Sequence, residues 1–171
     1  MEAIIRLIKD VPDFPKKGIV FKDITPVLEE PSAYQLLMKT WADRYRDSPV
    51  THFVGVESRG FLFASVLAYE LGKGFVLARK PGKLPRDTIS ASYALEYGED
   101  SLEMHRDSLD ANAQVVIVDD LIATGGTAKA VADMVCELGA KVYEIAAVIE
   151  LGFLDGRKVL EPLDVYSFIS Y

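Results

Sequence analysis

Cysteine is nearly absent from this chain of 171 residues, which contains only Cys136. No internal disulfide bond can form, so the sequence favours the reducing environment of the cytoplasm. A chain of this length buries enough hydrophobic core to fold without such a bond. Because Cys136 lies in an apolar segment with helical spacing, we expect it to pack inertly in the core.

Long hydrophobic runs are also missing. The longest uncharged run covers residues 60–69, far fewer than the roughly 20 apolar residues that a membrane span needs. The first residues, MEAIIRLIKD, carry charges and lack the apolar stretch of a signal peptide. We therefore expect a cytoplasmic protein without a membrane partner.

Basic residues are in the minority, because 19 Lys and Arg stand against 26 Asp and Glu, for a formal net charge of −7. This acidic balance argues against nucleic acid as the main partner. It still permits a phosphate ligand held by local basic residues. Histidine is scarce as well, and His52 and His105 do not have the spacing of metal ligands, so we expect both to be structural or exposed.

The common phosphate-loop motifs, G-x-x-x-x-G-K-[ST] and G-x-G-x-x-G, are absent. A different segment, VVIVDDLIATGGTA at 115–128, places four β-branched residues before Asp119 and Asp120, and a small-residue loop after them. An apolar run without alternation is typical of a strand buried on both faces of a parallel sheet. Small residues at a helix start offer backbone N–H groups to an anion. With carboxylates beside them for a ribose diol, the segment predicts a phosphorylated ribose as ligand.

The periodicity of apolar residues predicts an α/β fold. The expected helices cover residues 3–9, 32 to about 45 or 46, 60–71 and about 126–138, and the expected strands cover 52–56, 74–79, 115–119, 142–150 and 165–170. Ser32 and Gln35 form a capping box, and Gly72 closes the third helix. Residues 11–24 indicate a loop or edge segment, and 88–107 a hairpin or mobile excursion. Two βαβ units imply a mostly parallel twisted sheet flanked by helices, in a single domain.

Basic residues follow two of the predicted strands. Arg59 and Gly60 come after the strand at 52–56, and Arg79 and Lys83 come after the next one. Parallel strands bring their carboxyl ends to one edge of the sheet, where ligands bind. We expect the arginine and lysine side chains to grip a phosphate there, with the glycine allowing the backbone to approach it. The alternative is a set of solvated turns.

Five blocks of sequence carry a resemblance to a known family. They are GIVFKDITPVL (18–28), ESRGFLF (57–63), RKPGKLP (79–85), SYALEYG (92–98) and VVIVDDLIATGGT (115–127). The last block alone would indicate only the phosphoribosyltransferase superfamily, which includes orotate and xanthine enzymes. All five, in this order, resemble the adenine phosphoribosyltransferase family. The resemblance implies a type I phosphoribosyltransferase fold, with an N-terminal hood over about 11–26 and a mobile lid over about 86–107.

The resemblance also implies an activity. Members of this family transfer ribose 5-phosphate from phosphoribosyl pyrophosphate to N9 of adenine, which yields AMP and pyrophosphate in purine salvage. It implies Mg²⁺ carried by the substrate rather than by direct protein ligands, and a homodimer. Two alternatives stay open: an enzyme for another purine, such as hypoxanthine or guanine, and a non-enzymatic regulator with this fold. The regulator would need a DNA-binding appendage or a damaged lid, and the sequence has neither.

By similarity, the sugar phosphate and the pyrophosphate each have their own residues. The 5-phosphate would lie in the loop of Ala123, Thr124, Gly125, Gly126 and Thr127, and the ribose hydroxyls would face Asp119 and Asp120. Arg59 and Lys83 would hold the pyrophosphate. Arg79 is assigned to the pyrophosphate too, and could reach the site of a neighbouring subunit.

The adenine side follows from the same resemblance. Val20 and Lys22 would offer backbone groups to the base, while Phe21 and Leu121 would sandwich its ring. Glu96 is the expected catalytic residue, at N7 or N9 of adenine, with Tyr97 beside it in the lid. The sequence leaves open whether Glu96 is a general base or an orienting acceptor. Lys22 stands where the family more often has Arg, which matters if the side chain itself acts.

Overall fold

The computed structural model describes residues 2–94 and 99–171, so Glu96 and Tyr97 lie outside the described residues. The chain divides into two compact units, Met1–Arg44 and Tyr45–Tyr171. Of the described helices, none combines the length and the apolar character needed to cross a membrane.

The first unit is built around a short hairpin. It contains α1 (Glu2–Ile5), β1 (Lys9–Pro12), β2 (Val20–Asp23), α2 (Thr25–Glu29) and all but the last residue of α3 (Pro31–Tyr45). Strands β1 and β2 pair antiparallel, with Lys9 opposite Asp23. The predicted helix over 3–9 is therefore wrong beyond Ile5, because pairing with β2 satisfies the backbone groups of residues 9–12 in a strand instead.

The start of α3 also differs from the prediction. Helix α3 begins at Pro31, so Ser32 lies inside its first turn. Glu30 accepts hydrogen bonds from the backbone N–H of Ser32, at 3.3 Å, and from its hydroxyl, at 2.6 Å. The predicted capping box of Ser32 and Gln35 is wrong, because the preceding carboxylate satisfies the first turn.

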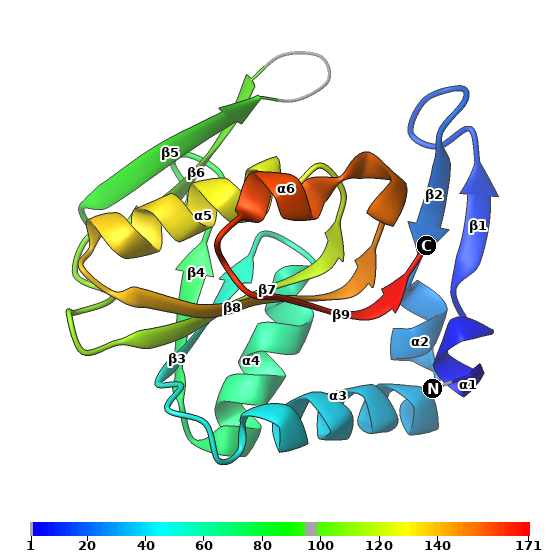
Figure 1. The fold of residues 1–171 in the computed structure, drawn as a ribbon, viewed down its shortest axis with the longest axis horizontal. Coiled ribbons are helices and arrows are strands. Elements are labelled where there is room, and N and C mark those ends of the chain that lie inside the picture. The colour runs from blue at the N-terminus through cyan, green and yellow to red at the C-terminus, as the bar shows by residue number, and fades with distance from the viewer. Residues whose placement is uncertain (1, 95–98) are drawn as a thin grey trace. The chain divides into compact units, whose positions relative to one another are not determined.

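The second unit contains a five-stranded parallel sheet. Its strands are β3 (His52–Val56), β4 (Gly74–Ala78), β7 (Gln114–Ile122), β8 (Lys141–Glu150) and β9 (Val165–Ser170), in the order β4-β3-β7-β8-β9. All four pairings are parallel. Figure 1 shows α4 (Gly60–Leu71) and α5 (Gly126–Glu137) on opposite faces of this sheet. The predicted α/β fold with a parallel sheet flanked by helices is confirmed.

The central strand β7 explains why the apolar run of the sequence was informative. Val115, Val116, Ile117 and Val118 are all fully buried. A strand covered by a helix on each face needs apolar side chains on both, which removes the usual alternation. Gly72 ends α4 in a left-handed conformation, with φ 63°, as predicted for a helix-closing glycine.

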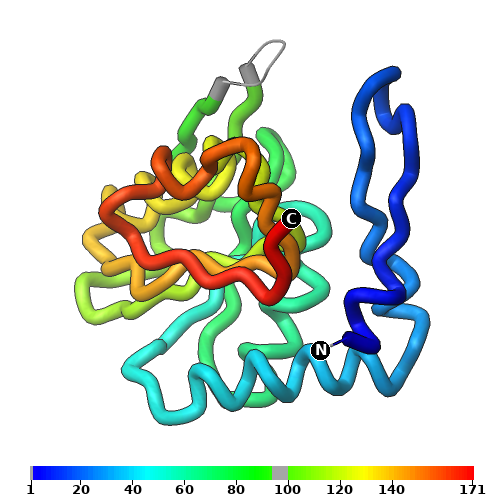
Figure 2. Tube along the Cα trace, turned by 45° about the vertical axis from the view of Figure 1, so that its right-hand side comes forward, coloured from blue at the N-terminus to red at the C-terminus, as the bar shows by residue number. Residues whose placement is uncertain are grey.

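The remaining elements of the second unit lie next to this sheet. Strands β5 (Thr88–Ala94) and β6 (Glu99–His105) form an antiparallel hairpin, which Figure 2 shows as two strands running side by side. Arg79, just after β4, bridges to Glu103 of β6 through two backbone hydrogen bonds. The sequence did not indicate the short helix α6 (Gly156–Leu160) or the 3₁₀ turn Gly152–Leu154.

The single cysteine does not pack in the core. Helix α5 buries Val131, Met134 and Val135, whereas Cys136 is exposed. These apolar neighbours form the buried face of α5, and position 136 falls outside that face. The prediction of a core cysteine is therefore wrong.

Replacing Tyr45 by Phe is expected to destabilise the second unit. The hydroxyl of Tyr45, a fully buried residue, donates a 2.6 Å hydrogen bond to Glu144, which is 5% exposed. Losing a hydrogen bond to a buried carboxylate should lower the free energy of unfolding by about 1.5 to 3 kcal/mol in urea titrations. Tyr69→Phe, at a residue that is 89% exposed, is the matched control. Equal stability of the two variants would contradict the expectation.

Candidate active site

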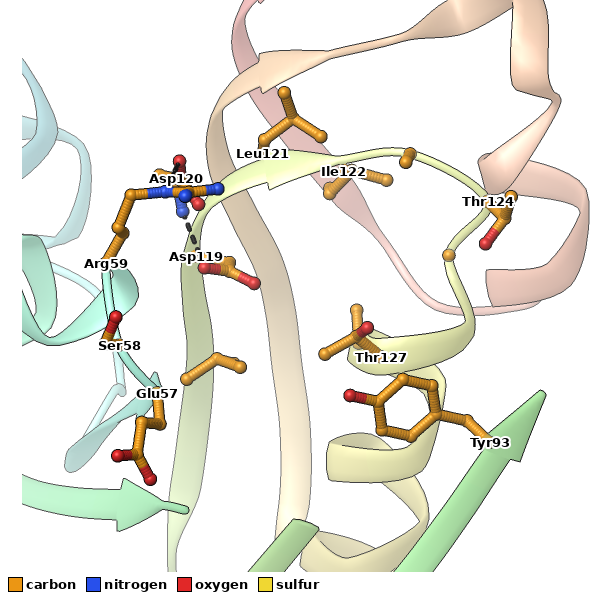
Figure 3. A pocket seen from close by; sticks show the side chains of 14 residues that line it. Glu57, Ser58, Arg59, Tyr93, Asp119, Asp120, Leu121, Ile122, Thr124 and Thr127 are labelled. Atoms are coloured by element: carbon orange, nitrogen blue, oxygen red, sulfur yellow. Dashed lines mark hydrogen bonds and ion pairs between the residues drawn. The ribbon is translucent and has the colours of Figure 1, made fainter. Parts of the chain in front are cut away.

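A cavity of about 370 Å³ opens at the carboxyl edge of the parallel sheet. Its wall consists of residues 56–59, residues 119–125, residues 127–128 and Tyr93. These come from the end of β3, the end of β7, the start of α5 and strand β5. Figure 3 shows Arg59 approaching from one side and Thr127 and Tyr93 from the other, with Asp119 between them. The predicted meeting of strand ends at one edge is thus confirmed for β3 and β7.

The loop before α5 has the geometry of an anion site. Ala123, Thr124, Gly125 and Thr127 line the cavity, and Gly126 is the first residue of the helix. Gly125 is the N-cap, in a left-handed conformation with φ 83°, and no side chain caps the helix there. The N–H groups of a first turn carry the positive end of the helix dipole and favour a negative charge.

Asp119 and Asp120 differ in their surroundings although they are adjacent. Asp120 is 4% exposed, and its carboxylate accepts a 2.5 Å charge-assisted hydrogen bond from Nε of Arg59. Its backbone N–H donates to the Asp119 carboxylate at 2.8 Å. Desolvation, followed by the nearby charge of Asp120, raises the pKa of Asp119 well above its ordinary value. A second negative charge is therefore unfavourable here, and the site favours an incoming positive charge.

Gly60 permits a close approach between two backbone segments, and its role beside a phosphate stays a prediction. A Cβ at this position would lie 2.4 Å from the carbonyl oxygen of Val118 and 3.2 Å from Cα of Asp119. Such approaches are too close for any side chain. The glycine therefore lets the start of α4 pack against β7, and this contact holds the preceding Arg59 beside the aspartates.

Arg79 and Lys83 do not line the cavity. Arg79 donates through Nε and Nη2 to both carboxylate oxygens of Glu57, at 3.2 and 3.1 Å, and through Nη1 to the Lys83 carbonyl. The hydrogen bond from Arg79 is the main cause that holds the pKa of Glu57 below its ordinary value. The side chain of Lys83 lies on the surface. The pyrophosphate roles of these two basic residues stay predictions.

Sequence reasoning assigned no role to six residues of the cavity wall, of which Glu57 and Tyr93 carry polar side-chain contacts; the others are Val56, Ser58, Ile122 and Ala128. The Tyr93 hydroxyl donates to Asp100 at 3.2 Å and accepts from Nζ of Lys80 at 3.3 Å, and Lys80 and Asp100 also form an ion pair. The alternation of strand β5 carried the signal for Tyr93, because Ala91 and Tyr93 pack on the same side against the core.

The predicted adenine contacts fall in three places. Val20, Phe21 and Lys22 lie on β2 of the first unit, where Lys22 forms a 2.6 Å ion pair with Asp10. Leu121 lines the cavity of the second unit. Glu96 and Tyr97 belong to the part of the chain that the structure leaves undescribed. All of these base-binding roles stay predictions.

The fold and this cavity define an α/β protein that combines an uncapped helix start with two adjacent carboxylates at the carboxyl edge of its sheet. A family model described as "Phosphoribosyl transferase domain" matches residues 24–167. The adenine phosphoribosyltransferase of Anaeromyxobacter sp. is 52% identical over 171 residues, covering 100% of this chain and 97% of the relative.

Solved structures show the same similarity. The adenine phosphoribosyltransferase of Thermoanaerobacter pseudethanolicus has a TM-score of 0.96 at 50% identity, with 99% of each chain covered. The Saccharomyces cerevisiae enzyme, complexed with an imino-altritol bisphosphate and adenine, has a TM-score of 0.93 at 38% identity, covering 98% of this chain and 97% of that one. The chain belongs to the phosphoribosyltransferase family, and within it to the adenine phosphoribosyltransferases.

Replacing Asp119 by Asn is expected to stabilise the protein in a pH-dependent way. Because folding raises the pKa of Asp119 above its ordinary 3.8, the wild type loses stability as the pH rises above that value, until the raised pKa is passed. Below the ordinary pKa the carboxyl is protonated in both states and costs nothing. The free energy of unfolding of Asp119→Asn should therefore exceed that of the wild type near neutral pH, and the difference should shrink in acid.

Urea titrations between about pH 4 and pH 8 measure this difference. Asp47→Asn, at an exposed residue of the same unit, is the control and should change stability by less than about 0.5 kcal/mol. An Asp119→Asn variant that is less stable than the wild type at neutral pH would contradict the raised pKa.

Proposed function

We propose that the protein transfers the ribose 5-phosphate unit of phosphoribosyl pyrophosphate to N9 of adenine, releasing AMP and pyrophosphate in purine salvage. The observation that carries this proposal is a single cavity that joins the uncapped start of α5 to the carboxylates of Asp119 and Asp120. A phosphorylated ribose needs both groups. Adenine as the acceptor is supported by full-length relatives that are adenine phosphoribosyltransferases, and by the yeast relative that was solved with adenine.

The sugar phosphate is assigned to the loop and the acidic pair. Residues 123–127 bind the 5-phosphate through backbone N–H groups and the hydroxyls of Thr124 and Thr127. Asp119 and Asp120 accept hydrogen bonds from the ribose hydroxyls. Only residues 123–125 separate the end of β7 from the start of α5, so the acidic pair and the phosphate-binding loop belong to one continuous segment.

The reaction separates charge along the bond between C1 of the ribose and the pyrophosphate. Positive charge develops on the sugar, as in glycoside cleavage. Desolvation and the neighbouring Asp120 raise the pKa of Asp119, so its ionised form is disfavoured in the free protein, and a developing cation would offset that cost. Arg59 and Lys83 stabilise the negative charge of the departing pyrophosphate, with Arg79 as a further cation.

Magnesium fits this donor set as an ion brought by the substrate. In the described ranges, 2–94 and 99–171, no group of three or more His, Cys, Asp or Glu side chains is placed to hold a metal. Mg²⁺ commonly binds through one or two carboxylates together with substrate phosphates and water. The carboxylates in the cavity wall are Asp119, Asp120 and Glu57, and Glu57 is already paired with Arg79. When bound, the ion would neutralise charge on the pyrophosphate.

Adenine binding is assigned to residues from three segments. Val20 and Lys22 contribute backbone groups, Phe21 and Leu121 flank the ring, and Glu96 accepts or orients the proton at N9 or N7. Tyr97 completes the lid. We further propose a homodimer in the cytoplasm, on the basis of the family and of the single cysteine.

The decisive assay supplies Mg²⁺, phosphoribosyl pyrophosphate and one base at a time. Adenine should be converted to its mononucleotide at least about 100-fold more efficiently than hypoxanthine or guanine, since a site built for one set of polar groups rejects a base that leaves them unpaired. The initial rate of nucleotide formation, followed by chromatography, is the measurement. A preference for hypoxanthine or guanine would show that another purine is the acceptor. If no base yields a nucleotide, the result would favour the non-enzymatic regulator.

Glu96→Gln is expected to lower kcat by about 10²- to 10⁴-fold, the usual contribution of a proton-transferring group. KM for phosphoribosyl pyrophosphate should change little, because the donor is held elsewhere. Steady-state kinetics with saturating adenine provide the measurement, and Glu137→Gln, on the exposed face of α5, is the matched control. An unchanged kcat in Glu96→Gln would remove this residue from the chemistry.

A further inference from the structure

We propose that Gly156 and Arg157, in the first turn of α6, are positioning residues for the phosphate-binding loop at 123–127. Helix α6 contributes no residue to the described wall of the cavity. It nevertheless lies against the outer side of the loop and fixes its shape. The inference rests on the proposed function only for the identity of the ligand that the loop binds.

The contact between α6 and the loop is made by backbone atoms on both sides. A Cβ on Gly156 would lie 2.3 Å from the carbonyl oxygen of Ala123 and 3.1 Å from the backbone nitrogen of Gly125. In the other direction, a Cβ on Gly125 would lie 2.6 Å from the carbonyl oxygen of Gly156. Real Cβ contacts are not this short, so a side chain at either glycine must displace the other segment.

The helix that makes this contact is itself held firmly to the sheet. Arg157 donates through Nε and Nη2 to the two carboxylate oxygens of Glu150, both at 2.7 Å, and through Nη1 to the Val165 carbonyl at 2.8 Å. Ser167 donates to Glu150 at 2.7 Å. Glu150 is only 5% exposed, and the hydrogen bond from Arg157 is the main cause that keeps its pKa below the ordinary value.

This support continues directly to the loop. Glu150 pairs with Ile122 in the register of β8 and β7, and Ile122 is the last strand residue before the loop. Leu160, at the other end of α6, is fully buried and would lie 3.3 Å from a Cβ on Gly125. The loop is therefore braced by strand pairing on one side and by α6 on the other.

The brace matters because the loop has little to hold its own shape. Its residues are small, its N-cap is a glycine, and no side chain caps the following helix. Backbone N–H groups bind a phosphate well only when they are held in the right orientation. A rigid external support supplies that orientation before the ligand arrives, which lowers the cost of binding.

Gly156→Ala is the direct test. The new methyl group must push the Ala123 carbonyl and the Gly125 nitrogen, so KM for phosphoribosyl pyrophosphate should rise by about 10- to 100-fold, as expected for a displacement of about 1 Å at a binding group. KM for adenine should stay within about twofold of the wild type, because all the residues assigned to the base lie outside the loop at 123–127, and only Leu121 is near it. The dissociation constant of AMP, measured by calorimetry, should rise in parallel with the donor KM.

Gly152→Ala is the matched control. This glycine lies on the same connection from β8, and its added Cβ would meet Ser170 Oγ and the Tyr171 carbonyl at 3.3 Å, away from the loop. It should lower the melting temperature without changing either KM. Arg157→Lys is the second variant, because it keeps the charge but loses the paired hydrogen bonds to Glu150. It should raise the donor KM by about threefold, corresponding to a loss of under 1 kcal/mol.

The outcomes separate a positioning role from a merely structural one. A selective rise in the donor KM of Gly156→Ala supports the proposal. If the alanine variant fails to fold, the same rise in Arg157→Lys supports it. Two unchanged KM values, or parallel rises for donor and base, would overturn it. Failure of the proposed function is distinguishable, because the wild-type protein would then make no AMP.

Discussion

The backbone passes very close to itself on both sides of the end of β7, and glycine alone permits this. On one side Gly60 brings the start of α4 against the Val118 carbonyl, where a Cβ would lie 2.4 Å away. On the other side Gly156 brings α6 against the Ala123 carbonyl, where a Cβ would lie 2.3 Å away. The first contact places Arg59 beside Asp120, and the second braces the loop before α5. The cavity takes its shape from these two approaches, and the charges in it depend on that shape.

The electrostatics of the cavity are unfavourable until a ligand arrives, and this fits the reaction. Asp119 is desolvated beside another carboxylate, which raises its pKa, whereas Asp120 is compensated by Arg59. Keeping such a group lowers the stability of the free protein, as expected when a site is optimised for a transition state. A cationic sugar between the aspartates and the departing pyrophosphate would offset that cost. The site would therefore stabilise the charge-separated transition state more than the ground state of the substrate.

The sequence predicted those helices and strands whose first and last residues are marked by local sequence signals, such as a glycine after a helix. Strands 52–56 and 165–170 and helix 60–71 match their predicted bounds, and Gly72 ends that helix as expected. The β1–β2 hairpin was missed because its pairing joins segments separated by prolines and glycine, and α6 because five residues show no periodicity. In the site, the 119–127 segment was found from residue types alone. The partners of Arg79 and Tyr93 were not, because a basic or aromatic residue does not reveal which carboxylate it will meet in space.

The two halves of the proposed reaction are built on different kinds of structure. The sugar phosphate is assigned to the end of β7, the central strand of the five-stranded parallel sheet. The four residues of β7 before Asp119 are fully buried. Three of the proposed adenine contacts, Val20, Phe21 and Lys22, lie on a two-stranded hairpin, and such hairpins are only marginally stable by themselves. A flat, uncharged base needs shape and a few backbone hydrogen bonds, whereas charge separation at C1 needs dipoles that do not reorganise. The proposed donor side therefore rests on the parallel sheet, with α6 packed against the outside of its loop.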